Sequence, residues 1–221
     1  MATYNVYSPF NGTITGLNCY CNAIANPCAP NCDQTGTKCK NKSEINCKTC
    51  TNPCFCSCCY HTVVGAALGN CCPMDIAGVS VGTYVVAYLG YNIRSVMIDI
   101  MDDVCSANCS VCQGNDIDKG TYVQLYTALN AGGKYLGRIL YAHLSNRQYS
   151  DGQIINAPLP GSWNIYLGTV PSKPDGQKCY GGPHTHLCVK AESGVSVARN
   201  NNLNCDSPVT GGSTAVYTWT Y

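Results

Sequence analysis

The sequence predicts a mainly β protein whose core is an antiparallel sheet or sandwich, interrupted by a long cysteine-rich loop insertion. Segments rich in β-branched and aromatic residues, bounded by Gly, Pro and Asn, recur along the 221 residues, and Glu and Lys, which favour helices, are scarce. Thirteen of the 19 cysteines fall between Cys19 and Cys72. The length suits one sizeable core, divided into first strands at 1–18, the insertion at 19–75 and the rest of the core at 76–221.

The first seventeen residues, MATYNVYSPFNGTITGL, predict two short strands joined by a turn that contains Pro and Asn-Gly. From Cys19 to Cys59 no apolar repeat is present, which is typical of a disulfide-stapled excursion with little core of its own.

Strand patterns return after the insertion. Residues 79–104 are dominated by β-branched and aromatic side chains, whereas TYVQLYTAL at 121–129 fits a strand or a short helix equally well. Further strands are expected within 137–146, 151–159, 161–170, 185–191 and 214–221.

The cysteines favour a disulfide framework over a metal-thiolate cluster, because their spacing repeats no zinc-finger or zinc-ribbon template. We therefore expect an oxidising compartment and a protein that is secreted or held at the cell surface. The odd number leaves a thiol free, metal-bound or paired to another chain, so a disulfide-linked or homo-oligomeric assembly stays open. Asn-x-Ser/Thr sites at Asn11, Asn41 and Asn108 fit a glycosylated exterior in a eukaryotic host.

Charge and hydropathy exclude several partners. The net charge is +1 and only 11% of residues are charged, so neither nucleic acid nor a membrane surface is expected as a partner. No apolar run reaches the length of a membrane span, and we expect a soluble product. The start lacks the regions of a secretion signal; either the protein leaves the cell another way or the chain is a mature form with a start methionine, which we favour.

Two of the four histidines stand in GGPHTHLCV. In an extended strand His184 and His186 project to the same face, a geometry that suits one metal ion or a ligand beside a general base. A surface strand that carries two histidines without a role is the alternative.

His143, in YAHLS, is the third histidine within a strand pattern. The order YAHLS, GQII and GPHTH resembles the lysostaphin-type (LytM-like) zinc endopeptidases, which cut peptide bonds in bacterial cell walls. VYSPFNGTITG and IRSVMIDI are similar to strands of that family, so the resemblance covers 3–17 and about 91–190. It implies the family's β core, with His186 as a zinc ligand and with His143 and His184 as catalytic partners beside the metal.

The chain also departs from this family. The family's other two ligands come from a His-x-x-x-Asp motif ahead of the first strand, where this chain has only MATYN. The pair could lie upstream in a precursor. His61 could instead fold back as a ligand, with Asp75 or a free cysteine, although its spacing matches no motif and favours an ordinary histidine in a cysteine-rich loop. The third interpretation is a degenerate site in a binding or structural module, as in the leukocyte-derived chemotaxin relatives of these peptidases.

Acidic residues could complete or orient such a site. Asp99, Asp102 and Asp103 in IDIMDD could bind metal or accept a hydrogen bond from a histidine, or they could be solvated residues of a turn.

Cysteine and aromatic side chains are further candidates. Cys188 could be a thiolate ligand, but a disulfide with Cys179 or Cys205 is favoured, and a cysteine nucleophile beside a histidine is disfavoured because oxidation would silence it. Four aromatic side chains could line a groove for peptide or sugar, or fill the core: Tyr141, Trp163, Tyr166 and Tyr180.

We therefore predict a secreted, disulfide-rich module whose degenerate peptidase-like core serves extracellular binding or structure, with a peptide or cell-wall glycopeptide as ligand. The alternative is an active zinc endopeptidase that cleaves cell-wall or Gly-rich peptides, with zinc as the cofactor.

Overall fold

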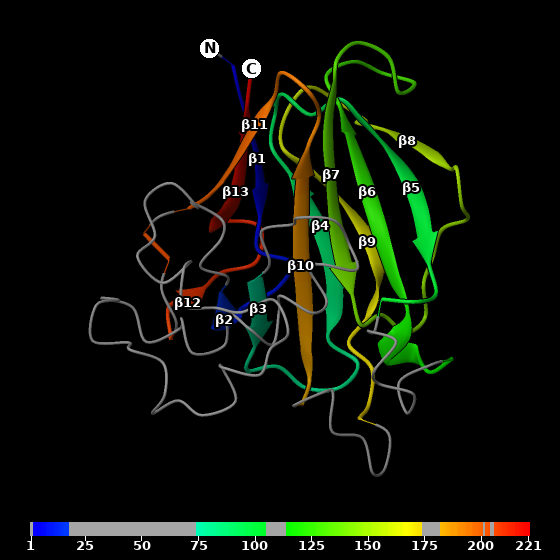
Figure 1. The fold of residues 1–221 in the computed structure, drawn as a ribbon, viewed down its shortest axis with the longest axis vertical. Coiled ribbons are helices and arrows are strands. Elements are labelled where there is room, and N and C mark those ends of the chain that lie inside the picture. The colour runs from blue at the N-terminus through cyan, green and yellow to red at the C-terminus, as the bar shows by residue number, and fades with distance from the viewer. Residues whose placement is uncertain (1, 18–73, 105–113, 174–181, 201, 204–205) are drawn as a thin grey trace.

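A computed structural model describes residues 2–17, 74–104, 114–173, 182–200, 202–203 and 206–221. Two antiparallel sheets face each other across one core, and the described part of the chain adds only one short 3-10 helix, η5 (Asp116–Asp118). The prediction of a mainly β, antiparallel fold is therefore confirmed. Figure 1 shows β4 and β9 behind β10, β7 and β6, which makes the two layers visible.

The first sheet has five strands. Its order is β11 (Ser196–Arg199), β13 (Ala215–Thr220), β1 (Thr3–Tyr7), β4 (Tyr84–Leu89) and β9 (Trp163–Thr169). The N-terminal and C-terminal strands thus lie side by side at its centre (Figure 1).

The second sheet has eight strands. Its order is β12 (Pro208–Val209), β2 (Gly12–Leu17), β3 (Met74–Ala77), β10 (His184–Ala191), β7 (Tyr135–Ala142), β6 (Gly120–Tyr126), β5 (Ser95–Met101) and β8 (Ile154–Asn156). The segment that fitted strand or helix equally well is therefore strand β6, which pairs on both sides with neighbouring strands.

The core lies between the sheets and follows from the alternation of side chains along each strand. Val6 and Leu89 from the five-stranded sheet, and Leu187 from the eight-stranded sheet, are fully buried in one apolar cluster. Trp163 donates its indole N–H to the carbonyl of Ile93 at 2.7 Å, so this large side chain is buried with its polar atom bonded. The buried residues therefore identify which face of each strand points into the core.

The cysteine-rich insertion joins two hydrogen-bonded neighbours. β2 pairs antiparallel with β3, and Leu17, the last residue of β2, lies opposite Met74, the first residue of β3. The segment 18–73 between them lies outside the described residues, so its disulfides are a prediction still. The described core resumes at Met74, two residues ahead of the expected start at 76.

No helix in the described part of the chain is long and apolar enough to cross a membrane.

Candidate functional site

Alternate side chains of β10 point to opposite faces of the eight-stranded sheet. Thr185 and Leu187 are fully buried toward the core, so His184, His186 and Cys188 project to the face of the eight-stranded sheet that is turned away from the five-stranded sheet. We call this face the outer face of the eight-stranded sheet. The predicted common orientation of the two histidines is confirmed.

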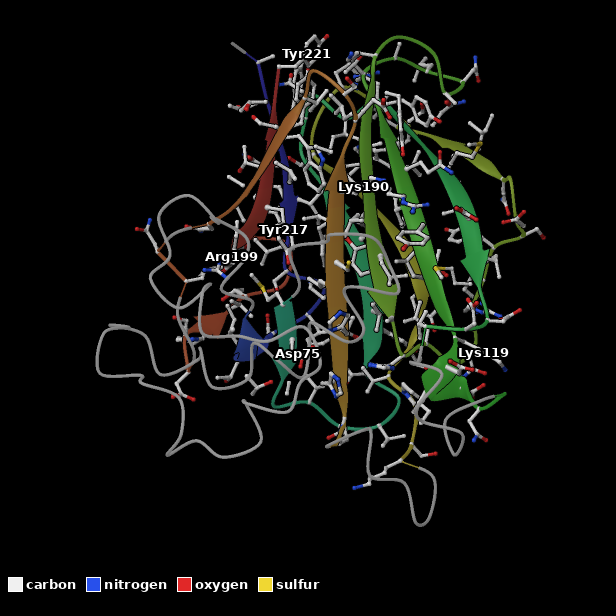
Figure 2. All side chains as sticks on the ribbon, viewed as in Figure 1. Asp75, Lys119, Lys190, Arg199, Tyr217 and Tyr221 are labelled. Atoms are coloured by element: carbon white, nitrogen blue, oxygen red, sulfur yellow. The ribbon has the colours of Figure 1, made fainter. Side chains whose placement is uncertain are left out.

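Asp75 reaches this face from the neighbouring strand. In the β10–β3 ladder His186 lies directly opposite Asp75, and His186 Nδ1 is 2.8 Å from Asp75 Oδ1. His184 Nε2 lies 4.0 Å from the same oxygen. Figure 2 labels Asp75 beside the lower half of β10, with Lys190 further up that strand. The Asp75 carboxylate therefore lies at hydrogen-bond distance from His186 and near, but not bonded to, His184.

His143 arrives from β7 by a different route. The expectation that it lies inside a strand is wrong, because β7 ends at Ala142 and His143 has a φ of 63°. This left-handed conformation is unfavourable for a residue with a Cβ atom. It turns the chain so that the imidazole ring lies 4.8 Å from that of His184 and 6.3 Å from that of His186, between ring centroids. The strained backbone at His143 therefore brings its imidazole next to the other two.

Two of the imidazoles are anchored by backbone carbonyls. His143 Nδ1 lies 2.5 Å from the Ile117 carbonyl and His184 Nδ1 lies 2.7 Å from the Gly182 carbonyl. Because a carbonyl only accepts, both rings carry their proton on Nδ1 when neutral, and Nε2 carries the lone pair. Burial, together with the charge of a protonated His184, lowers the pKa of His143 to about 3, so His143 is neutral at physiological pH.

His186 and Asp75 stand at one end of a row of cross-strand neighbours on the outer face. The strand registers align Asp75, His186, Ala142, Gly120 and Met101 on five successive strands. Beside this row lies a small buried apolar cluster, formed by Val104, Tyr122, Leu140, Ala142 and Cys188.

A pocket of about 380 Å³ lies at the far end of this face, lined by Asp99, Ile100, Met101, Asp102, Asp103, Tyr122 and Arg138. Asp102 accepts a hydrogen bond from Arg147 at 2.5 Å, and Asp99 lies 3.7 Å from Arg138. The described contacts of these two carboxylates are with arginines and, for Asp99, with Asp151, but not with a histidine. The interpretation of Asp99 and Asp102 as partners of the histidines finds no support in this arrangement.

The other candidates fall in several places. Tyr141 is fully buried in the core. Trp163 is also buried but borders a small hollow on the five-stranded sheet, where Tyr166 is partly exposed. Cys188 is buried in the apolar cluster beside the histidines. The positions that lie outside the described residues are His61, Cys179, Tyr180 and Cys205.

Asp75 is the residue whose place the sequence did not reveal. The sequence suggests Asp75 only as a partner of His61, whereas in the fold it contacts His186 directly. The available signal was the MDIA pattern, in which an acidic residue alternates with Met74 and Ile76, both fully buried. Which strand pairs with β10 is a property of the tertiary fold, and no local pattern gives it.

Among the described residues no three histidine, cysteine, aspartate or glutamate side chains are arranged as ligands of one metal ion. Comparison with known proteins gives no family, since no family model, curated protein or solved structure matches the chain.

Proposed function

We propose that the chain is a zinc-dependent hydrolase of peptide bonds, with His186 and Asp75 as two of the metal's ligands. The observation that carries the proposal is the 2.8 Å approach of His186 Nδ1 to Asp75 Oδ1, beside two further histidines. Histidine nitrogen and carboxylate oxygen are both ordinary zinc ligands. The resemblance of YAHLS and GPHTH to the lysostaphin-type peptidases supports the same chemistry.

The donor atoms suit a shared metal ion. Two donors on a tetrahedral zinc lie roughly 3.4 Å apart, given bond lengths near 2.1 Å. The observed 2.8 Å separation is a hydrogen-bond distance, so a metal ion bound by both atoms would replace this hydrogen bond and hold the atoms roughly 0.6 Å further apart. Both side chains are largely buried, at 3% and 16% exposure for His186 and Asp75. Buried histidine–carboxylate pairs recur in metal centres, where the carboxylate either binds the metal or orients the histidine.

A catalytic zinc needs a third protein ligand, and the described residues do not supply it. The sequence offers two sources outside them. The first is His61. The second is Cys71, which stands four residues before Asp75, the spacing at which the resembling family has its histidine ahead of the aspartate. A cysteine thiolate is itself a zinc ligand.

Bound zinc would supply a water of lowered pKa and would polarise the scissile carbonyl. The chain's own residues then move the proton. The bond from His143 Nδ1 to the Ile117 carbonyl leaves the lone pair on Nε2, beside the other two imidazoles, so His143 is placed to accept a proton as a general base. His184, oriented by the Gly182 carbonyl, can donate a hydrogen bond from Nε2 to a developing oxyanion once it is protonated.

The substrate class follows from the resemblance, which points to cell-wall or Gly-rich peptides. The cysteine content supports an extracellular place of action. The pocket beside Asp99 lies on the same sheet face as the histidines and could receive another part of a long substrate.

The first experiment is to measure metal content by elemental mass spectrometry on protein purified without chelators. We expect near-stoichiometric zinc in the wild type and its loss in His186→Ala and Asp75→Asn. His143→Asn is the matched control, because it removes an imidazole of the same cluster that is not a proposed ligand, and it should retain zinc. His61→Ala and Cys71→Ser then identify the third ligand.

Hydrolysis is measured next, with a fluorescence-quenched pentaglycine peptide. Cleavage by the zinc-loaded wild type and its loss in His143→Asn, with zinc retained, would support the enzyme. A wild type that takes up no zinc when zinc is offered would contradict the proposal and would favour the non-catalytic binding module.

A further inference from the structure

The five-stranded sheet presents a second, chemically different surface. Its five strands contain a single charged residue, Arg199, which lies opposite the fully buried Tyr217 and is therefore on the inner side. The face of this sheet that is turned away from the core, which we call the tyrosine face, thus bears no Asp, Glu, Lys or Arg at its strand positions. Apart from Val86 on β4, its partly or fully exposed outward side chains are small, hydroxyl, amide or tyrosine groups.

Two tyrosines lie together near one end of this face. Tyr84 on β4 is 67% exposed, and its ring centroid lies 5.1 Å from that of Tyr166 on β9, with the rings 77° apart. Their neighbours Val85 and Leu167 are buried, which confirms that the two tyrosines point outward. A largely exposed tyrosine braced by a second ring is a stacking surface that loses little side-chain entropy on binding.

A second pair lies further along β4. Tyr88 lies directly opposite Tyr7 on β1, and both border a hollow of about 80 Å³ lined also by Leu89, Ser162, Trp163, Asn164 and Gly212. Asn164 is exposed and lies opposite Tyr88 in the β4–β9 ladder. Four residues of strand separate Tyr84 from Tyr88, roughly 13 Å. The face therefore offers two aromatic stations along one strand, with an amide beside one of them.

This chemistry selects the occupant. Nucleic acid and acidic polymers need cationic side chains, which the strands of this face lack. A protein interface usually gathers its large anchors at one centre. Here the tyrosines are divided between two stations, with Val86, which lies opposite Tyr166, between them on β4. Sugar rings combine an apolar C–H surface, which packs on an aromatic ring, with hydroxyls that exchange hydrogen bonds with amide and phenol groups.

We propose that the tyrosine face binds a neutral oligosaccharide chain lying along β4, with sugar rings stacked at Tyr84/Tyr166 and at Tyr7/Tyr88. Asn164 hydrogen-bonds hydroxyl groups of the sugar at the second station. The separation of the stations favours a chain of several sugars over a single one. This surface belongs to the sheet opposite the histidine group, so its binding is independent of the metal site, and either proposal can fail alone.

The test is isothermal titration calorimetry of the full chain with chitohexaose, cellohexaose and maltohexaose, with a heparin hexasaccharide as the charged comparison. We expect at least one neutral hexasaccharide to bind and the heparin fragment not to bind. The Tyr84→Ala/Tyr166→Ala double variant should weaken binding at least about tenfold, as for a central aromatic contact. Asn164→Ala should weaken it less.

The matched control is Tyr126→Ala. Tyr126 also pairs with a second tyrosine, Tyr135, at 5.2 Å between centroids, but on the eight-stranded sheet, so binding should be unchanged. Near-UV circular dichroism and thermal unfolding verify that each variant is folded, and Asn164→Ala keeps the test valid if the double variant is not. The proposal is overturned if no neutral hexasaccharide binds at millimolar concentration, or if binding survives in folded variants of both kinds.

Discussion

His186 and Asp75 face each other across the β10–β3 ladder, with His186 Nδ1 2.8 Å from Asp75 Oδ1. The two residues are 111 positions apart in the chain. Strand register alone brings them together, since each is the direct cross-strand neighbour of the other. The pair is therefore as rigid as the sheet that carries it, which is the condition a catalytic or metal-binding pair requires.

Asp75→Asn should weaken zinc binding by at least about tenfold, because an amide is a much poorer zinc ligand than a carboxylate of the same size. Competition with a chromophoric chelator measures the affinity. Asp99→Asn is the matched control, since Asp99 is a carboxylate on the same sheet face in the separate pocket. Equal zinc affinities in the two variants would remove Asp75 from the ligand set.

The left-handed backbone of His143 predicts that an asparagine variant is more stable than a valine variant. At a φ of 63°, asparagine is tolerated and a β-branched residue is not. His143→Asn should leave the free energy of unfolding within about 0.5 kcal/mol of the wild type or raise it, whereas His143→Val should lower it by about 1–3 kcal/mol. Urea unfolding measures both. Equal stability of the two variants would show that the left-handed conformation is absent in solution.

A glycine in β7 controls how closely β7 and β10 approach. At Gly137, which has a φ of 126°, an added Cβ would overlap the carbonyl oxygen of Lys190. We expect Gly137→Ala to destabilise the protein by about 3 kcal/mol or more, because backbone rather than a mobile side chain must shift. Gly152→Ala is the control: its φ is 73° but open space surrounds the site, so only backbone strain of about 1 kcal/mol is expected. Thermal unfolding should separate the two variants clearly.

Thr185 lies on the core side of β10, fully buried, and its hydroxyl has no hydrogen-bond partner among the described residues. Thr185→Val replaces this hydroxyl by a methyl group of similar size and should stabilise the protein by about 1 kcal/mol. Thr169→Val should have the opposite effect, because the Thr169 hydroxyl is bonded to Ser145 and Asn146. Denaturant unfolding of both variants under one set of conditions is the measurement, and destabilisation by Thr185→Val would contradict the assignment.

The carboxyl of Asp99 predicts a pH effect. Burial, then the neighbouring Asp151, raise the pKa of Asp99 above its ordinary value of 3.8, despite the nearby Arg138. A raised carboxyl pKa favours folding at low pH, and this contribution is lost as pH rises from about 3.8 through the raised value. The free energy of unfolding of Asp99→Asn should therefore gain on the wild type over that interval, by less than about 1 kcal/mol because the group is partly exposed.

Unfolding curves between pH 3 and pH 7 test this expectation, with Asp206→Asn, at an exposed position, as the control. A difference between Asp99→Asn and the wild type that does not vary with pH would contradict it.

Local pattern was sufficient for most strands. The alternation in SVMIDIM and the β-branched and aromatic content of WNIYLGT predicted strands that the fold contains, because side-chain period and burial are short-range properties. The common direction of His184 and His186 followed from the same period. What could not be predicted is which strands pair, since the register that sets Asp75 against His186 depends on contacts far apart in sequence.

The prediction that His143 lies within a strand was wrong for a different reason. The run GRILYAHLSN reads as one strand, yet the chain turns at His143 and is held there by the bond from the Leu144 amide to the Lys119 carbonyl and by the pairing of Ser145 with Thr169. A left-handed conformation at a residue other than glycine cannot be recognised from the sequence. Tertiary contacts offset its strain, and these contacts exist only in the folded chain.

Because Leu17 and Met74 are cross-strand neighbours, everything between them is topologically equivalent to the loop of a hairpin. The entropy of closing a loop grows slowly with its length, so such a junction tolerates long or short connections with little change in the sheet. The β2–β3 junction is thus a place where a lineage could acquire, exchange or lose a whole cassette of sequence in one event. It is also where an engineer could graft a foreign loop, or a simple turn, next to the residue that faces His186.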